Sequence, residues 1–380
     1  KLQVGGLLQT RFVWSNIRTG QTDPTVQDRK QDRYAFDLPN TQLWFRGHVF
    51  GPSVQYMVKA RFTNNTAIFL GEQGPVPLGD GSGTLQLMDA WIRFQLTDNW
   101  SVRAGQYRSP YSREFLIPEQ YQLAVNRSIV DFHMGLGYTQ GVELQFISDD
   151  IRWLLSLDDG GNDNLSGPAL STVDGNPANS PWFRQDSDIS VTTRLEWKPF
   201  GAWQDFASFT SPMGQAQGWL LGAAFHYQQS QLPILNSPVI NNLGGYNEWY
   251  AWTVDSQYNF GGASLFGSFY YNYLESPAAY LRTGFNPPQP VNLGFINIWG
   301  LVLQGAIYIA PKWELFARYE LSNWRATNQN SLPLAFRSPS MLNVATVGVN
   351  WYINGQDVKL TTDIGNSFTA TEPQTSDLRA

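Results

Sequence analysis

The sequence predicts an all-β protein whose antiparallel strands form one transmembrane β-barrel. Three features lead to this prediction. Apolar and polar residues alternate along many segments, short and long connections alternate between those segments, and the composition is poor in charge but rich in aromatic residues. Charged residues make up 15% and aromatic residues 14% of the chain, whereas a typical soluble domain has about 25% charged residues.

The alternation has a period of two residues, which indicates strands with one apolar face. It is clearest at residues 53–62, 188–197, 347–353 and 358–364. Residues 293–310 leave the register open, because Ile298 and Val302 oppose Leu301 and Leu303. Alternation alone fits a soluble sandwich with a buried apolar face as well as a large barrel with its apolar face towards lipid.

The connections favour the membrane barrel. We predict fifteen strands at residues 3–15, 34–50, 53–64, 85–97, 99–107, 135–147, 150–158, 186–198, 217–230, 246–260, 262–275, 293–310, 312–322, 339–353 and 356–366. Short turns at 51–52, 98, 149, 261, 311 and 354–355 alternate with long polar links at 16–33, 65–84, 108–134, 159–185, 231–245, 276–292 and 323–338. The link 199–216 is the exception, because it is long where a short turn is expected. Short periplasmic turns and long external loops are typical of barrels in the bacterial outer membrane.

Aromatic residues lie near both ends of the predicted strands, as two girdles at the membrane interfaces would. Trp14, Trp252 and Trp324 are near long links, and Trp100, Trp197 and Trp351 are near short turns. The alternative explanation is the general preference of aromatic residues for strands. No apolar run is long enough for a transmembrane helix, and the chain begins in a strand-like segment, as a processed protein would.

Other function classes find little support. The chain has no cysteine, its three histidines are isolated, and no His-Glu-x-x-His or Gly-x-Ser-x-Gly motif is present, so we expect neither cofactor nor enzyme activity. Residues 158–164 offer oxygen ligands but lack the spacing of a known calcium loop, and we interpret them as an external turn. The net charge of -6 argues against a nucleic-acid partner.

Residues 103–114 have the sequence RAGQYRSPYSRE, preceded by DAWI at 89–92 and followed by Arg127 and Ser128 and then by GVEL at 141–144. Near the end of the chain, GVNWYI at 348–353 is followed by VKL at 358–360. These segments resemble a central motif and the last hairpin of the phosphate-selective porin O and P family. The similarity runs from about Gly5 to Ile364.

The resemblance implies a sixteen-stranded barrel that assembles as a homotrimer, with the third external loop folded into the lumen. By position that loop is residues 108–134. We expect its apolar residues to pack on the barrel wall, namely Phe115, Leu116, Ile117, Ile129 and Val130. The chain departs from the family in having few lysines and in placing Glu114, Glu119 and Asp131 in this loop. The family name is therefore no guide to the solute.

Basic side chains are the candidate pore residues. Strand parity places Arg11, Arg46, Lys59, Arg61, Arg93, Arg103 and Arg194 inside the barrel. The predicted constriction and anion-binding site consists of Arg46, Lys59, Arg61, Arg93, Arg103, Arg108, Arg113 and Arg127. Arginine binds oxyanions through two donors and stays charged, and rings of charged side chains set pore selectivity. The alternative is that these residues pair with Asp89, Glu143 and Glu196 and leave the lumen neutral.

We expect a porin through which small polar solutes and ions diffuse passively, with a weak to moderate anion preference and the lipid bilayer as its surroundings. Two alternatives stay open. One is a structural or adhesion barrel that binds a partner through its loops, and the other is a barrel enzyme, which would need a His-Ser or His-Asp pair at the outer rim.

The expected domain is one barrel spanning residues 1–380. The number of strands in bacterial barrels is even and both termini are periplasmic, so we expect a sixteenth strand. Residues 367–380 are polar, like an external loop, which would place that strand beyond residue 380. Strand 3–15 has Gly6, Leu8 and Thr10 on its outward face, and this flat face is the candidate trimer contact.

Overall fold

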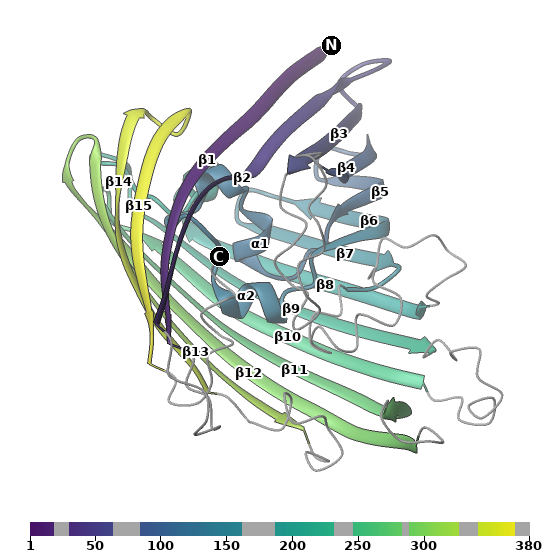
Figure 1. Ribbon diagram of the computed structural model, residues 1–380. Coiled ribbons are helices and arrows are strands. Elements are labelled where there is room, and N and C mark those ends of the chain that lie inside the picture. Colours follow the sequence, from purple (N-terminus) through teal and green to yellow (C-terminus); the bar gives the residue numbers. More distant parts are fainter. Residues whose placement is uncertain are drawn as a thin grey trace.

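The computed structural model describes residues 1–18, 30–63, 84–161, 187–231, 246–282, 289–326 and 341–368. The described residues form fifteen strands in one antiparallel sheet, in which strands adjacent in the sequence are adjacent in the sheet (Figure 1). They are β1 (Leu2–Arg18), β2 (Lys30–His48), β3 (Val54–Thr63), β4 (Thr84–Gln95), β5 (Trp100–Arg108), β6 (Tyr138–Ile147), β7 (Ile151–Asp158), β8 (Ser187–Phe200), β9 (Gly218–Gln231), β10 (Tyr246–Asn259), β11 (Ala263–Arg282), β12 (Gln289–Ala310), β13 (Trp313–Ala326), β14 (Met341–Asn354) and β15 (Val358–Ser367).

Every predicted strand is present, and most ends differ from the prediction by a few residues. The largest differences occur at long links that the sequence pattern assigned to loops. There β1 and β2 extend until Arg18 pairs with Lys30, and β11 and β12 extend until Arg282 pairs with Gln289. Ladder hydrogen bonds join backbone groups, so a hairpin continues into polar sequence that carries no apolar alternation.

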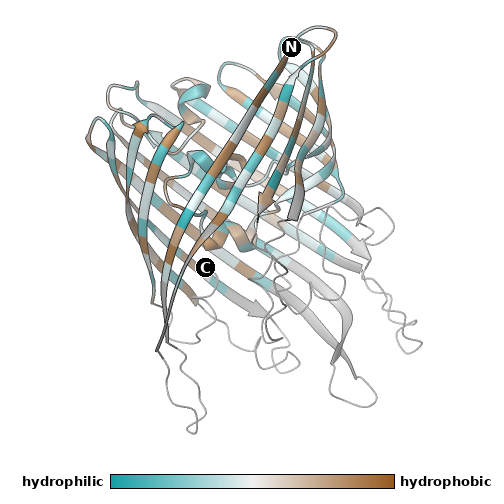
Figure 2. Ribbon diagram, turned by 45° about the horizontal axis from the view of Figure 1, so that its top comes forward, coloured by the Kyte–Doolittle hydropathy of each residue, from teal (hydrophilic) through white to brown (hydrophobic). Residues whose placement is uncertain are grey.

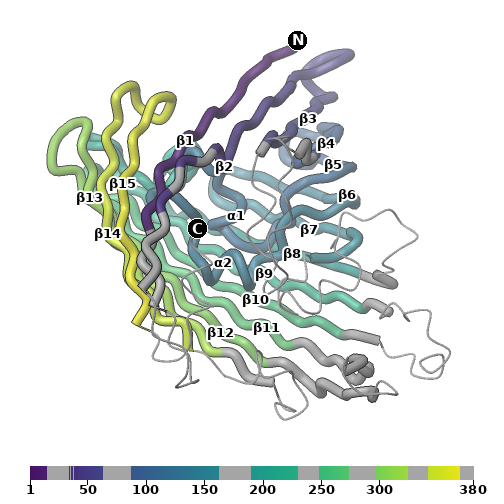
Figure 3. The backbone as a smooth tube through the Cα atoms, viewed as in Figure 1, coloured from purple at the N-terminus to yellow at the C-terminus, as the bar shows by residue number. Residues whose placement is uncertain are grey.

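The sheet curves around a central space, and the link between β5 and β6 crosses its concave side (Figures 1 and 3). Among the described residues, β1 pairs with β2 alone and β15 with β14 alone. Residues 369–380, which belong to the segment predicted as an external loop, lie outside the described ranges.

No helix in the described part of the chain is long and apolar enough to cross a membrane.

The two faces of the sheet differ in polarity, and Figure 2 shows brown and teal residues alternating along the strands. On β12, Leu303 and Ile307 are 47% and 54% exposed, whereas Ile298 and Val302 are completely buried. This settles the open register of residues 293–310. The strand is apolar on both faces for two different reasons. Its outer face belongs to the exposed apolar surface of the sheet, and its inner face is buried under another segment of the chain.

The cover over β12 comes from the link between β5 and β6, which carries α1 (Arg113–Leu116), the 3-10 turn η1 (Glu119–Tyr121) and α2 (Ile129–Met134). Ser112 and Ser128 cap the two helices, because their side-chain oxygens accept hydrogen bonds from the backbone N–H groups of Phe115 and Asp131. The sequence analysis predicted this segment as a loop and did not predict its helical turns.

Of the apolar residues predicted to pack on the wall, Ile117, Ile129 and Val130 are buried against it, whereas Phe115 and Leu116 are half-buried. Ile129 and Val130 belong to one buried cluster with inward residues of five strands, among them Trp249, Tyr270, Ile298, Val302 and Val344. Gly300 makes the close approach possible. A Cβ atom at this position would lie 2.5 Å from Cγ1 of Val130 and 2.7 Å from Sδ of Met134, far below a normal contact, so only glycine fits here.

The long link on the short-turn side also folds inward. Its 3-10 turn η3 (Trp203–Phe206) ends at the buried Phe206, and Phe209 is buried three residues later. The ring of Phe209 lies 4.6 Å from that of Phe266, in a cluster that includes Ile117 and Leu123 of the β5–β6 link. Two links from opposite ends of the strands therefore meet against the inner face of the sheet.

Candidate functional site

Four basic side chains surround one carboxylate, Glu119 of η1, on the concave side of the sheet. Lys59 and Arg61 share the inner face of β3, Arg108 ends β5, and Arg127 precedes α2. Oε1 of Glu119 lies 3.1 Å from Nη1 of Arg127 and 3.5 Å from Nη2 of Arg61. Oε2 lies 3.0 Å from Nη2 of Arg108 and 3.8 Å from Nζ of Lys59. We call these five residues the Glu119 cluster.

The Glu119 cluster is partly shielded from solvent and carries a net positive charge. The Glu119 side chain is 9% exposed, that of Lys59 6% and that of Arg61 25%. Burial alone would raise the pKa of Glu119, but the charges of Arg108, Arg127 and the other two cations hold it well below its usual value. Four cations and one carboxylate leave a net charge of +3 (4 − 1), and Asp89 lies opposite Lys59 in the ladder.

The two link-side arginines of the cluster also hold the end of α1. Arg108 Nη1 donates to the carbonyl oxygen of Phe115 at 2.9 Å, and Arg127 Nη2 donates to that of Ile117 at 3.0 Å. The Phe115 ring lies between them, with Arg127 Cζ 4.7 Å and Arg108 Cζ 5.5 Å from its centroid. The carbonyl groups at the end of a helix attract cations, so Arg108 and Arg127 position the link while they line the concave space.

Three other predicted site residues lie apart from the Glu119 cluster. Arg103 pairs with Glu143 at 2.8 Å, and Arg93 donates to Gln55. Arg46 is exposed and donates to Oε1 of Gln3 at 3.0 Å. For Arg103, the alternative of a neutralising ion pair is therefore the better description.

Arg113 requires a correction, because the structure separates it from Arg108 and Arg127. Its side chain is 2% exposed and lies 3.8 Å from Glu196 Oε1, and its Nε donates to Gln257 Oε1 at 3.0 Å. The cause is the chain just before α1, where the carbonyl oxygen of Tyr111 accepts a hydrogen bond from Arg194 on β8 at 2.8 Å. This anchor directs Arg113 towards β8 and β10, where Glu196 and Gln257 enclose its side chain.

The other two acids of the link are anchors and do not face solvent. Both oxygens of Glu114 accept hydrogen bonds from Ser128, one from its N–H and one from its hydroxyl, each at 2.6 Å. Asp131 accepts from Tyr270 at 3.1 Å. Burial, reinforced by Asp131, raises the pKa of Glu114 to about 7, and burial also raises the pKa of Asp131.

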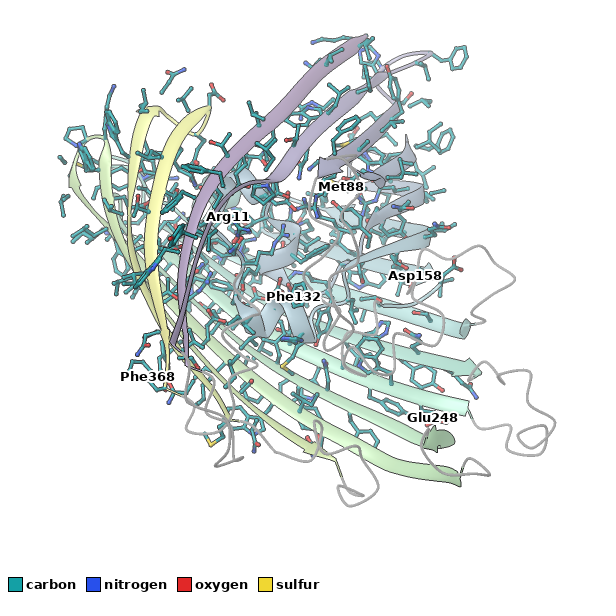
Figure 4. All side chains as sticks on the ribbon, viewed as in Figure 1. Arg11, Met88, Phe132, Asp158, Glu248 and Phe368 are labelled. Carbon is teal, nitrogen blue, oxygen red and sulfur yellow. The ribbon has the colours of Figure 1, made fainter. Side chains whose placement is uncertain are left out.

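Several contributors to the site were missed by the sequence analysis. Arg318 on β13 donates to the carbonyl oxygen of Asn126 at 2.9 Å, and Lys359 on β15 donates to that of Gln122 at 2.7 Å. Arg11 on β1, labelled in Figure 4, was already expected inside the barrel, and it donates to Asn126 Oδ1 at 3.2 Å. Strand parity could have shown that Arg318 and Lys359 face inward, but nothing in the sequence indicated which carbonyl groups they would meet.

The described residues contain no group of three or more potential metal ligands. The barrel-enzyme alternative needs a histidine paired with a serine or an aspartate. Nδ1 of His226 lies 2.8 Å from Thr192 Oγ1, but Nε2 of His226 lies 3.3 Å from Gln228 Oε1, which is an amide oxygen and not a carboxylate. In the segment considered for calcium, Asp158 accepts from Ser190 at 2.9 Å and from the Gly160 N–H at 3.0 Å. Residues 162–164 of that segment lie outside the described ranges.

The family model "Phosphate-selective porin O and P" matches residues 15–170, which confirms the resemblance over this part of the chain. No curated protein matches. A loop L8 deletion mutant of OmpT, an outer-membrane protein of Vibrio cholerae, is similar in structure with a TM-score of 0.54 at 10% identity, covering 98% of this chain and 95% of that one.

Two further solved structures are similar. The outer-membrane channel DcaP of Acinetobacter baumannii has a TM-score of 0.54 at 11% identity, with 96% of this chain and 91% of that chain covered. In-vitro folded OmpT of Vibrio cholerae, in a trimer form, has a TM-score of 0.50 at 10% identity, with 97% and 89% covered. At these identities the likeness shows the fold, and with the family match it identifies a bacterial outer-membrane protein.

Proposed function

We propose that this outer-membrane protein, similar to the phosphate-selective porins O and P over residues 15–170, is a porin through which small polar solutes and ions diffuse passively. The proposal rests chiefly on the Glu119 cluster. Its cations come from β3, from the end of β5 and from a link that crosses the concave side, and a narrow passage lined in this way attracts anions. The proposal includes no enzyme activity.

We propose a weak to moderate anion preference without tight capture of phosphate. Lys59, Arg61, Arg108 and Arg127 favour anions, but Glu119 already occupies the position between them. Arg93 and Arg103 extend the basic wall, and Glu143 neutralises part of it. The net charge of the whole chain, -6, gives no additional attraction.

The proposed barrel has sixteen strands, with the β5–β6 link as the third external loop folded into the lumen. The supporting observation is the pair of edges left by β1 and β15. A bare strand edge in lipid leaves backbone groups without hydrogen-bond partners, each at a cost of several kcal/mol, and a sixteenth strand between these edges removes that cost. Intact mass measurement of the native protein, compared with 42.8 kDa for these residues, tests whether a further strand follows residue 380.

We further propose a homotrimer. Leu8 on β1 is 70% exposed and shares the outward face with the small Gly6, which supports a contact between barrels at this end of the strand. Light scattering in mild detergent should give the mass of three chains. The mass of one chain per micelle would contradict this assembly.

A second candidate is a structural or adhesion barrel with a closed lumen. It is favoured by the buried apolar clusters that the β5–β6 link and residues 201–217 form against β10–β14. Planar-bilayer recording of the purified protein separates the two candidates. Ohmic conductance steps support the porin, and a folded protein that inserts without conducting supports the closed barrel.

A further inference from the structure

We infer that Glu119 is the residue that limits the pore's affinity for oxyanions, because its carboxylate occupies the oxyanion site of its own chain. This inference rests on the proposed porin function and concerns one residue within it. Lys59, Arg61, Arg108 and Arg127 would by themselves form a four-cation cradle. In the native chain the Glu119 carboxylate fills it, so a passing anion must compete with an internal one.

The geometry is that of an oxyanion bound by several donors at once. Each oxygen of Glu119 lies near two cations, Oε1 near Arg61 and Arg127 and Oε2 near Arg108 and Lys59, at 3.0 to 3.8 Å. Guanidinium groups bind carboxylate and phosphate oxygens in the same way. The donors therefore present to Glu119 the arrangement that they would present to a solute phosphate or carboxylate.

Three of the four cations, Arg108, Arg127 and Lys59, are also held by contacts other than Glu119. Arg108 donates to Tyr138 Oη at 3.1 Å as well as to carbonyl groups of α1. Arg127 donates to the carbonyl oxygens of Glu114 and Ile117 at 3.2 and 3.0 Å. Lys59 lies over the Trp44 ring, 5.8 Å from its centroid, beside Asp89 in the ladder. Loss of the Glu119 charge would therefore leave most of the cradle in place.

The charge balance sets the direction of the effect. With Glu119 ionised the cluster carries +3, and without that charge it carries +4 (3 + 1), with an unoccupied position between the cations. Partial burial strengthens the attraction, because side chains exposed by 6% to 25% are screened less than free surface charges. Removing the Glu119 carboxylate should therefore raise the affinity of the Glu119 cluster for an oxyanion, so that an anion binds there where it would otherwise pass.

A role for Glu119 as a structural pin is the competing explanation, since it links the β5–β6 segment to β3. A pin would change the stability of the open state and the noise of the current. It would create neither saturable inhibition by phosphate nor a dependence of such inhibition on Arg61. These two readouts separate the explanations.

The decisive experiment uses the full-length protein in planar bilayers, with the variants Glu119→Gln and Asp357→Asn. Asp357→Asn is the matched control, because it removes the same charge from an exposed turn far from the cluster in the chain. For Glu119→Gln, inorganic phosphate should block the chloride current at a concentration about tenfold lower than for the wild type, and the reversal potential in a KCl gradient should shift towards anions. Asp357→Asn should resemble the wild type in both measurements.

Two further variants keep the result interpretable. Glu119→Asp retains the charge and should keep the weak phosphate block of the wild type, and adding Arg61→Gln to Glu119→Gln should reverse most of the gain. The inference is overturned if Glu119→Gln conducts but gains no phosphate block, or if Arg61→Gln does not alter the gain. If the wild type inserts without conducting, the porin proposal itself fails. This result differs from a wild type that conducts and a Glu119→Gln variant with unchanged ion selectivity, which would overturn the Glu119 inference alone.

Discussion

The concave side of the sheet has two walls, and the β5–β6 link binds them by different physical means. Towards β3 and β5, η1 meets charged partners, and the Arg61 side chain there keeps 25% of its surface exposed. Towards β10–β14, the side chains of α2 pack against apolar partners, and Val130 keeps 1% of its surface exposed. One inserted segment is therefore held by apolar packing on one wall and by charges on the other. The apolar wall sets where the link lies, and in the proposed porin the basic wall would set the ion preference.

The largest effect on stability should come from replacing an arginine that is buried in an ion pair. Arg194 is fully buried and pairs with Asp255 through two nitrogens, at 2.8 and 2.9 Å. Arg194→Met should lower the free energy of unfolding by about 3 to 5 kcal/mol, because Asp255 is left buried without its partner. Arg46→Met, at an exposed inward position, should cost less than about 0.5 kcal/mol. Urea unfolding in detergent measures both, and equal losses would contradict the contrast.

The next effect tests the fit between α2 and β12. Gly300→Ala places a methyl group 2.5 Å from Val130 Cγ1, and overpacking of this kind costs about 1 to 3 kcal/mol. We expect displacement of α2, seen as lower unfolding stability and a noisier current. The control is Gly267→Ala on β11, where the nearest atom to the added one is the end of the Leu303 side chain at 3.1 Å. If both variants behave like the wild type, the close approach of α2 to β12 is wrong.

A smaller effect distinguishes arginines of the same link. Replacing Arg108 and Arg127 with glutamine removes two charges of the Glu119 cluster, so the anion-to-cation permeability ratio should fall by a factor of about two to five. Arg113→Gln removes a charge enclosed by Glu196 and Gln257 and should leave that ratio unchanged while lowering stability. Reversal potentials in a KCl gradient measure the ratio. A shift for Arg113→Gln as large as for the pair would show that the assignment to separate clusters is wrong.

The smallest effect is a dependence of the link on pH. Burial, with Asp131 nearby, raises the pKa of Glu114 to about 7, although Arg318 and Ser128 oppose the shift. In the unfolded chain a glutamate has a pKa of about 4.3, so folding favours the protonated form. The contribution of protonated Glu114 to the free energy of unfolding is complete below about pH 4.3 and is lost as the pH rises through about 7. Hydrogen exchange of residues 128–131, corrected for intrinsic rates, should show weaker protection at high pH, and Glu114→Gln should remove the difference.

The alternation of side chains and of connection lengths was sufficient to predict all fifteen strands and their order. It also indicated that Lys59 and Arg61 face the same side, and the apolar residues of the link 108–134 indicated that Ile129 and Val130 pack on the wall. These are properties of a short stretch of chain, because strand period and turn length are local. The pattern also marked the link 199–216 as exceptional, without showing that residues 201–217 fold inward.

Tertiary structure alone decided which charges meet. Arg108, Arg113 and Arg127 look equivalent in the sequence, yet the anchor between Tyr111 and Arg194 sends Arg113 to Glu196. Glu119 reads as one of three acids opposing the basic wall, but η1 places it between four cations while Glu114 is bound by Ser128. An ion pair depends on a few ångströms between residues far apart in the chain, and such distances follow from packing, which period and composition do not encode.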